Sequence, residues 1–261
     1  MNADLRVLIS SSLLQMKQSF SRSMFKFCMV VYPLLYGFTL YMLYKDHDRE
    51  QIISYVMLGS AVSSLWGTIS FSSAGDINRE RFMGALEIIF NAPSRFMIIM
   101  LGKVIGNTIL GTASMIISIV FIVVSFGVPF TLADPFLFAI IFIIGILSFT
   151  AIAMLLSGLL TISRSTAVLM NCLDYPILIL CGVAFPISVL PQWTIPFSYI
   201  LSPTHFLILG RMCVKGISDY NLFSYHLLWL IGLTFLYTLL FLHFYKVIDI
   251  KARQHATLGV I

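Results

Sequence analysis

Charged side chains that could do chemistry or bind a partner gather in one stretch, residues 76–103, between two long apolar segments. Within it the large apolar residues Phe82, Leu86 and Ile89 recur at helical spacing. This spacing predicts an amphipathic helix from 79 to 91, lying parallel to a membrane surface. Such a helix suits contact with a moving partner, although an ordinary solvated loop helix gives the same pattern.

The same stretch lacks a nucleotide-binding loop, although Lys103 follows a glycine. Met97 stands where a phosphate loop needs its first glycine, and Val104 where it needs Ser or Thr. We therefore do not expect this chain to bind ATP itself. The five histidines are scattered without metal-ligand spacing. We expect no catalytic residue, cofactor or metal site, and a membrane enzyme such as a lipid-modifying transferase has no motif in its support.

Asp174 is the one acidic residue inside a long apolar segment, residues 166–185. A carboxylate within a membrane helix costs about 2.5 to 3.5 kcal/mol on insertion scales, so it should face protein, water or cargo. Pro176 removes a backbone donor nearby and predicts a kinked, partly hydrated helix. Two roles fit Asp174: an ion or proton site, or a packing role in a polar cluster or an ion pair with a neighbouring helix.

The composition places these residues in an all-α membrane protein. Hydrophobic residues make up 59% and charged residues 10%, whereas soluble domains hold about 25% charged residues. The mean hydropathy is +0.97. The first 26 residues carry five charges and no apolar core, so they are not a signal peptide. The net charge of +5 reflects cations at the inner membrane face and not nucleic-acid binding.

The apolar segments predict six membrane-spanning helices, at about 27–44, 52–71, 104–126, 136–160, 166–185 and 226–245. Residues 1–26 show an apolar stripe at helical spacing with cations on other faces, which predicts an interfacial helix on the inner leaflet. A helix packed on a soluble partner would show the same stripe. Residues 186–204 are apolar but contain four prolines, which predicts short re-entrant helices at the outer face.

Six spans put both termini on one side, together with residues 76–103. That side holds twelve of the sixteen Lys and Arg residues, and the other holds Lys45, Arg49, Arg211 and Lys215. The excess of cations predicts that both termini and residues 76–103 lie in the cytosol, below the cytoplasmic membrane.

Two motifs resemble the permease subunits of type-2 ABC exporters, the ABC-2 family. RERFMGALEIIFNAPSRFMIIMLGK is similar to the family's E-R-x-x-G-[TA]-L-E stretch with a following Pro and Gly-Lys. AFPISVLPQWTIPFSYILSPTHF is similar to its F-P-x-x-x-L-P segment before the last span. With six spans and an amino-terminal interfacial helix in this order, the resemblance covers nearly the whole chain.

The resemblance implies one transmembrane permease domain over 1–261, with an interfacial helix at 1–26, a cytosolic coupling region at 76–96 and an outer re-entrant segment at 186–204. It implies two ATP-binding ABC subunits at the inner face, which would bind the ATP, and a second copy of the permease or a homologous one. The residues it assigns to ATPase coupling are Arg79, Glu80, Arg81, Gly84, Glu87 and Arg95. Those it assigns to the translocation path are Asp174, Tyr175, Phe185 and Trp193.

The implied function is ATP-driven export of a drug, natural product, peptide or lipid-like amphiphile. Two alternatives stay open. Permeases that export polysaccharides or lipid-linked glycans share the interfacial helix and an aromatic-lined path. An ion-coupled secondary carrier would use Asp174, but such carriers usually show two halves with paired broken helices, and we find one such break.

Overall fold

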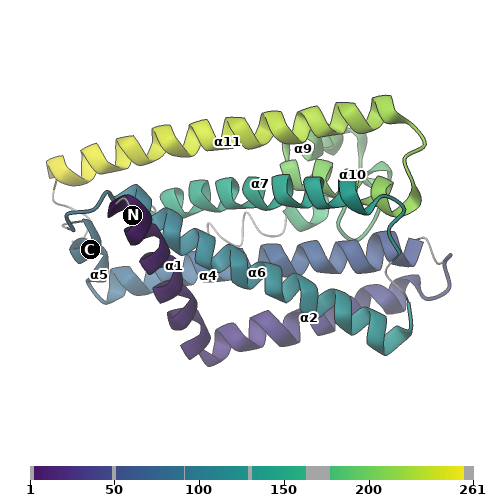
Figure 1. The fold of residues 1–261 in the computed structure, drawn as a ribbon, viewed down its shortest axis with the longest axis horizontal. Coiled ribbons are helices and arrows are strands. Elements are labelled where there is room, and N and C mark those ends of the chain that lie inside the picture. The colour runs from purple at the N-terminus through teal and green to yellow at the C-terminus, as the bar shows by residue number, and fades with distance from the viewer. Residues whose placement is uncertain (1–2, 49–50, 91, 129–130, 163–176, 256–261) are drawn as a thin grey trace.

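The computed structural model describes residues 3–48, 51–90, 92–128, 131–162 and 177–255. These residues form long helices without any strand among them, and Figure 1 shows most helices side by side along one direction. Five helices in the described ranges are long and apolar enough to cross a membrane. They are α2 (Ser23–Tyr44), the π-helix η1 (Ile52–Met57) running directly into α4 (Leu58–Phe82), α6 (Phe96–Phe126), α7 (Pro135–Ile162) and α11 (Tyr220–His255).

The structure is therefore that of the predicted all-α membrane protein. The predicted span at 166–185 lies largely outside the described residues. Its described end is helical only from 177 to 180, and the chain turns at Gly182, where φ is +68°. The prediction that this span continues to Phe185 is therefore wrong, because a left-handed glycine ends the helix first.

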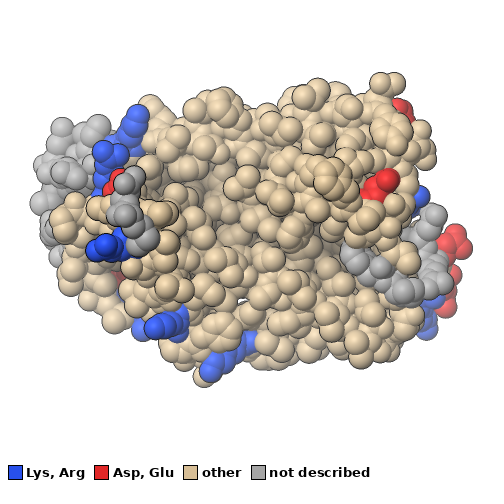
Figure 2. Space-filling model, in the orientation of Figure 1, with Lys and Arg blue, Asp and Glu red and all other residues tan. Residues whose placement is uncertain are grey.

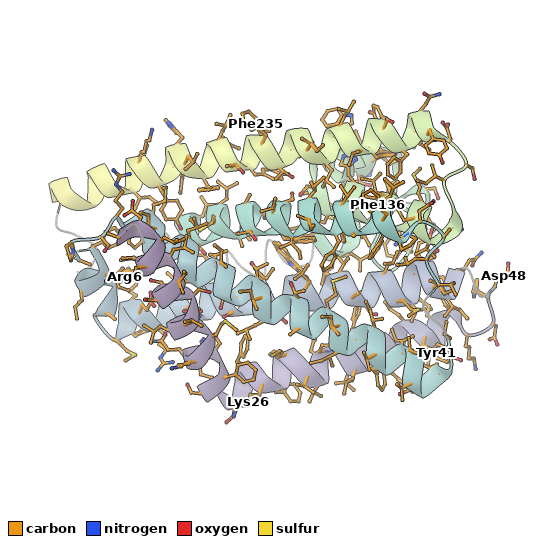
Figure 3. All side chains as sticks on the ribbon, in the orientation of Figure 1. Arg6, Lys26, Tyr41, Asp48, Phe136 and Phe235 are labelled. Atoms are coloured by element: carbon orange, nitrogen blue, oxygen red, sulfur yellow. The ribbon has the colours of Figure 1, made fainter. Side chains whose placement is uncertain are left out.

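The two ends of the bundle differ in charge. We call basal the end where α1 (Ala3–Ser21), α5 (Ala85–Phe90) and the end of α11 lie, and apical the end where α11 begins (Figure 1). Figure 2 shows Lys and Arg gathered mainly at the basal end, with an uncharged surface between the two ends. Apolar side chains such as Phe235, 64% exposed, project from the bundle (Figure 3). This is the surface that a lipid bilayer covers.

Helix α4 is the centre of the bundle. In its most apolar window, with η1, 89% of the residues are buried, against 17% for α11. Small side chains make this close packing possible. A Cβ added at Gly67 would lie 3.3 Å from the ring of Tyr32 on α2, and one added at Gly111 of α6 would lie 3.0 Å from Leu65. Glycine at these two positions therefore lets α4 pack closely against α2 and α6.

Helix α1 crosses the basal end with its polar face inward. Ser12, Gln15 and Ser19 are buried, whereas large apolar residues of the stripe, such as Leu13, are exposed. Arg22 has extended backbone, with φ −90° and ψ 120°, and separates α1 from α2. Small polar side chains on the protein side and apolar ones outside suit a helix at a lipid interface.

Two glycines of α6 let the backbone of α1 pack directly against it. A Cβ at Gly102 would lie 2.6 Å from the carbonyl oxygen of Leu8, and one at Gly106 would lie 2.7 Å from that of Ser12. Both distances are too short for any side chain, so the backbones touch only because both residues are glycine. The glycine pair thus fixes where α1 crosses α6.

The boundaries around residues 76–103 differ from those predicted. Helix α4 continues to Phe82, and α6 begins at Phe96 instead of at 104. The single helix predicted from 79 to 91 is wrong, because the chain turns at Gly84, where φ is +67°, before α5 starts. The Gly84 N–H donates to the carbonyl of Arg81 over 3.1 Å. A glycine in the left-handed conformation is a common helix end.

The apical segment is broken into short helices, as its prolines predicted. These are η2 (Ile187–Val189), η3 (Gln192–Thr194), α9 (Ile195–Ile200) and α10 (Ser202–Lys215). A proline stands at or next to the start of each, at 186, 191, 196 and 203. Proline suits these positions because its missing N–H has no helical partner there.

Candidate functional site

Three helices meet at a buried carboxylate at the basal end. Asp76 of α4, 8% exposed, forms an ion pair with Arg22, which lies between α1 and α2. It also accepts hydrogen bonds from the amide of Gln15 in α1 and, over 3.3 Å, from the amide of Asn107 in α6. Ser72 Oγ, one turn earlier in α4, donates to it over 3.1 Å. A buried carboxylate needs such partners to offset the loss of water.

The partners of Asp76 also bond to one another. Asn107 Oδ1 accepts from Gln15 Nε2 over 3.1 Å and shares the single hydroxyl proton of Ser72 with Asp76, at 2.7 Å from Ser72 Oγ. Arg22 Nη2 donates to Ser19 Oγ over 3.0 Å. We call this set the Asp76 cluster; its members are Gln15, Ser19, Arg22, Ser72, Asp76 and Asn107. In a low-dielectric interior such a connected network holds its helices in one arrangement, so α1, α4 and α6 are tied together here.

A second ion pair joins α4 to α6 one turn nearer the basal tip. Glu80 pairs with Lys103, and the two side chains are 12% and 10% exposed. Since Glu80 follows Asp76 by four residues and Lys103 precedes Asn107 by four, the two polar layers are stacked along the same helix pair. A cavity of about 10 Å³, close to the volume for one water molecule, lies between these layers.

Arg81 ties α4 to a fourth helix. Its Nη2 donates to the carbonyl oxygens of Leu160 and Thr161, over 2.9 and 2.8 Å. These carbonyls belong to the last described turn of α7. The guanidinium of Arg81 therefore links the end of α4 to α7.

The residues assigned to ATPase coupling divide into two groups. Arg79, Gly84 and Arg95 are exposed, whereas Glu80 and Arg81 point into the bundle. The side chain of Glu87 is not among those that the structure describes. The structure thus brings Glu80 and Arg81 into contact with α6 and α7, and it leaves the other three at the surface. Their role toward an ATPase stays a prediction.

The exposed surface at this turn is apolar. Phe82 is 84% exposed, Met83 65% and Ile88 73%, while Leu86 is buried. We call Phe82, Met83 and Ile88 the basal patch. Sequence periodicity placed Phe82 and Leu86 on one face, but the Gly84 turn directs them to opposite sides. The patch was missed because its signal is the helix-ending glycine and not the apolar period.

Of the four residues assigned to a translocation path, Asp174 and Tyr175 lie outside the described residues. Phe185 is half-buried just after the Gly182 turn. Trp193 is 73% exposed on η3. The structure therefore places Phe185 and Trp193 in the segment before α10 and leaves their assignment to a path as a prediction.

A comparison with protein families now gives these features a context. A family model described as an ABC-2 type transporter matches residues 4–213, from α1 nearly to the end of α10. A search of curated proteins finds no match. The family is a membrane transport component that is not itself catalytic, and its members generally work with ABC ATP-binding subunits. Since the match covers most of the 261 residues, the chain belongs to the ABC-2 type transporter family and is a multi-pass membrane permease.

Proposed function

We propose that this permease is the membrane-spanning subunit of an ATP-driven exporter in the cytoplasmic membrane. Two separate ABC subunits bind and hydrolyse ATP beneath its basal end, and a second copy or a homologous permease completes the transporter. Both termini are cytosolic. Family membership and the excess of Lys and Arg at the basal end support this orientation. The cargo is a drug, natural product, peptide or lipid-like amphiphile.

The observation that carries the proposal is the basal patch. Phe82, Met83 and Ile88 form an exposed apolar surface at the end of the bundle that is rich in cations. Lipid tails do not cover a surface at the cytosolic end, and an apolar patch rimmed by polar residues is typical of a protein contact. Arg79 precedes the patch residues in the sequence and Arg95 follows them, and both arginines are exposed and charged. The ATPase binds here.

The contacts behind the patch explain how movement of the ATPase reaches the membrane. The Asp76 cluster ties α4 to α1 and α6, and Arg81 ties it to α7. Helix α4 then continues without a break into η1 toward the apical end. A push on the patch therefore displaces the basal ends of four helices together, because packed helices move as rigid elements.

The test is to measure binding of the separate ATPase to the permease in lipid nanodiscs. Replacing Phe82 and Met83 together by glutamine should weaken binding at least about tenfold, as loss of a buried anchor does. Met24→Gln is the matched control, since Met24 is 61% exposed on α2, away from the patch. Equal binding by both variants would remove the patch from the interface. Transport driven by an ion gradient without any ATPase would instead support the carrier alternative that uses Asp174.

A further inference from the structure

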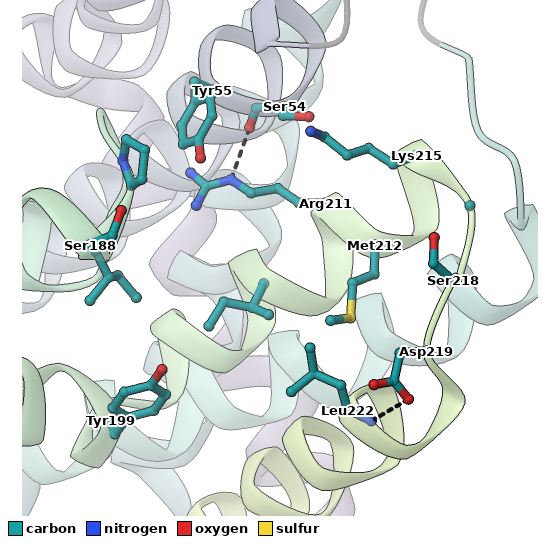
Figure 4. Close-up of a pocket in the computed structure, with 14 residues that line it drawn as sticks. Ser54, Tyr55, Ser188, Tyr199, Arg211, Met212, Lys215, Ser218, Asp219 and Leu222 are labelled. Atoms are coloured by element: carbon teal, nitrogen blue, oxygen red, sulfur yellow. Dashed lines mark hydrogen bonds between the residues drawn. The ribbon is translucent and has the colours of Figure 1, made fainter.

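A cavity of about 470 Å³ lies at the apical end, far from the basal patch (Figure 4). Its walls come from η1, the start of η2, the second half of α10 and the start of α11. The volume falls within the range of sites that hold small molecules, about 300 to 1,000 Å³. The side chains on these walls give the cavity a cationic character.

Arg211 of α10 stands in the wall of this cavity with only neutral partners. Its Nε donates to the carbonyl of Ser54 over 3.2 Å, and Nη2 donates to that of Gly182 over 2.6 Å. The guanidinium carbon lies 4.2 Å from the ring centroid of Tyr55. Among the described residues, no carboxylate contacts this guanidinium. A cation removed from water is best stabilised by an anion, and Arg211 has none in the described chain.

Burial also affects the charge of Arg211. Desolvation lowers the pKa of its guanidinium to about 10. The group therefore still carries its proton at neutral pH. It offers a permanent positive charge to whatever enters the cavity.

Two other charged residues line the described part of the cavity wall. Lys215, one helical turn beyond Arg211, lines the same space and reaches back toward Ser54 in Figure 4. Asp219 is the one carboxylate among the lining residues that the structure describes. Its Oδ1 accepts the backbone N–H groups of Asn221 and Leu222, over 2.9 and 3.2 Å, and so caps the start of α11. Arg211 and Lys215 are thus the cations, and Asp219 the carboxylate, among the described residues of the cavity wall.

A second, independent feature points to a bound group. The hydroxyl oxygen of Ser54 is buried and has no hydrogen-bond partner among the described residues, although Ser54 lines the cavity. Buried hydroxyls in proteins are nearly always paired, so an orphan at a cavity wall indicates a missing partner. Ser54 lies in the π-helix η1, and π-helical turns occur frequently at functional sites.

The backbone that holds Arg211 is itself tightly positioned. A Cβ added at Gly59 would lie 2.4 Å from the carbonyl oxygen of Val183. The turn at Gly182 and Val183 therefore packs directly on the start of α4, and only glycine permits that approach. This contact orients the Gly182 carbonyl toward Arg211. The cavity wall is thus set before any ligand arrives, as affinity for a small ligand requires.

We propose that this apical cavity is a phosphate-binding site. A phosphate group presents several acceptor oxygens, which suit the charge of Lys215 and the Nη1 amino group of Arg211, whose Nε and Nη2 already donate to backbone carbonyls. The Ser54 hydroxyl donates to the same group. The phosphate belongs to a free anion, to a lipid headgroup or to a phosphorylated amphiphile. Binding needs no ATP-driven step, so the proposal goes beyond the export function and stands apart from it.

The experiment uses the full chain purified in an uncharged, phosphate-free detergent. Binding of inorganic phosphate and of short-chain phosphatidylglycerol is measured by calorimetry, with chloride at matched ionic strength as the reference. Arg211→Gln should weaken binding of the preferred probe at least about tenfold, the effect of losing charged hydrogen bonds. Asp219→Asn should tighten binding, because Asn still caps α11 but carries no charge. Lys45→Gln removes a cation from the same end outside the cavity and should have no effect.

The two probes separate the sources of the phosphate. Tighter binding of the lipid identifies a headgroup or amphiphile, and tighter binding of inorganic phosphate identifies the free anion. Arg211 also holds the Gly182 turn, so Arg211→Gln requires a check of folding. If that variant does not fold, the affinities of Lys215→Gln and Lys45→Gln for the preferred probe are compared instead. Weaker binding by Lys215→Gln alone supports the proposal. The proposal is overturned if neither probe binds at about 10 mM, or if the cavity variant and the Lys45 control lose affinity equally.

Discussion

Replacing Asp76 by asparagine should release α1 from the bundle. Asparagine has nearly the same shape, but it leaves Arg22 without its counter-charge and turns an amide toward the donors of Gln15 and Asn107. Neutralising one partner of a fully buried ion pair costs about 3 to 5 kcal/mol. The Arg22 side chain is 22% exposed and that of Asp76 is 10% exposed, so water partly screens this ion pair. We therefore expect Asp76→Asn to destabilise the attachment of α1 by about 2 to 3 kcal/mol.

Hydrogen exchange of the α1 amides in nanodiscs measures this effect, since it reports local opening of a helix. A loss of 2 to 3 kcal/mol corresponds to protection lowered about 30- to 140-fold. Asp46→Asn is the control, because Asp46 lies in an exposed turn after α2. The double variant Arg22→Gln with Asp76→Asn should lose less than the sum of the two single changes. The same α1 protection in Asp76→Asn and Asp46→Asn would refute the reasoning and leave glycine packing alone as the attachment of α1.

Two glycine substitutions test the packing and the turn. Gly106→Ala should lower stability by about 1 to 3 kcal/mol, because the new Cβ would lie 2.7 Å from the Ser12 carbonyl. Thermal unfolding measures this loss, with Gly232→Ala as the control because a Cβ there meets open space. Equal unfolding midpoints for the two variants would contradict the prediction. Gly84→Ala has room for its Cβ but places it at φ +67°, so we expect a cost of about 1 to 2 kcal/mol and weaker ATPase binding. Gly84→Asn should largely restore both, since Asn tolerates this conformation, and indistinguishable Ala and Asn variants would argue against a left-handed requirement.

The apolar period across residues 79 to 91 shows why the sequence misled at the basal turn. Leu86 and Ile89 lie after the turn, in α5, and face the core. The apolar residues of α4 and α5 therefore keep the spacing expected of one continuous helix, although a turn separates them. Periodicity reports which residues are buried but not the sign of φ between them. The signal that was available is a glycine directly after a last helical turn with two arginines, which is a typical helix end.

The Asp76 cluster lay beyond sequence reasoning for a different reason. Its bonds join residues separated by 31, 54 and 61 positions. Polar residues such as Gln15 and Asn107 in apolar surroundings signal that some partner exists. Which partner it is depends on how α1 crosses α4 and α6, and two glycines of α6 decide that crossing.

The class of protein, most of its spans, the broken apical segment and the end that carries the cations could be predicted from the sequence. These follow from local quantities: apolar length, proline positions and charge counts. The folded structure was needed to show that α1 buries its polar face, that Glu80 and Arg81 point inward, and that Arg211 meets η1 at a cavity. Those outcomes depend on contacts between distant helices, whose packing energy no local pattern encodes. The charged stretch at 76–103 thus contains a turn whose exposed surface is apolar. Its charged residues Asp76, Glu80 and Arg81 point the other way and bind the neighbouring helices.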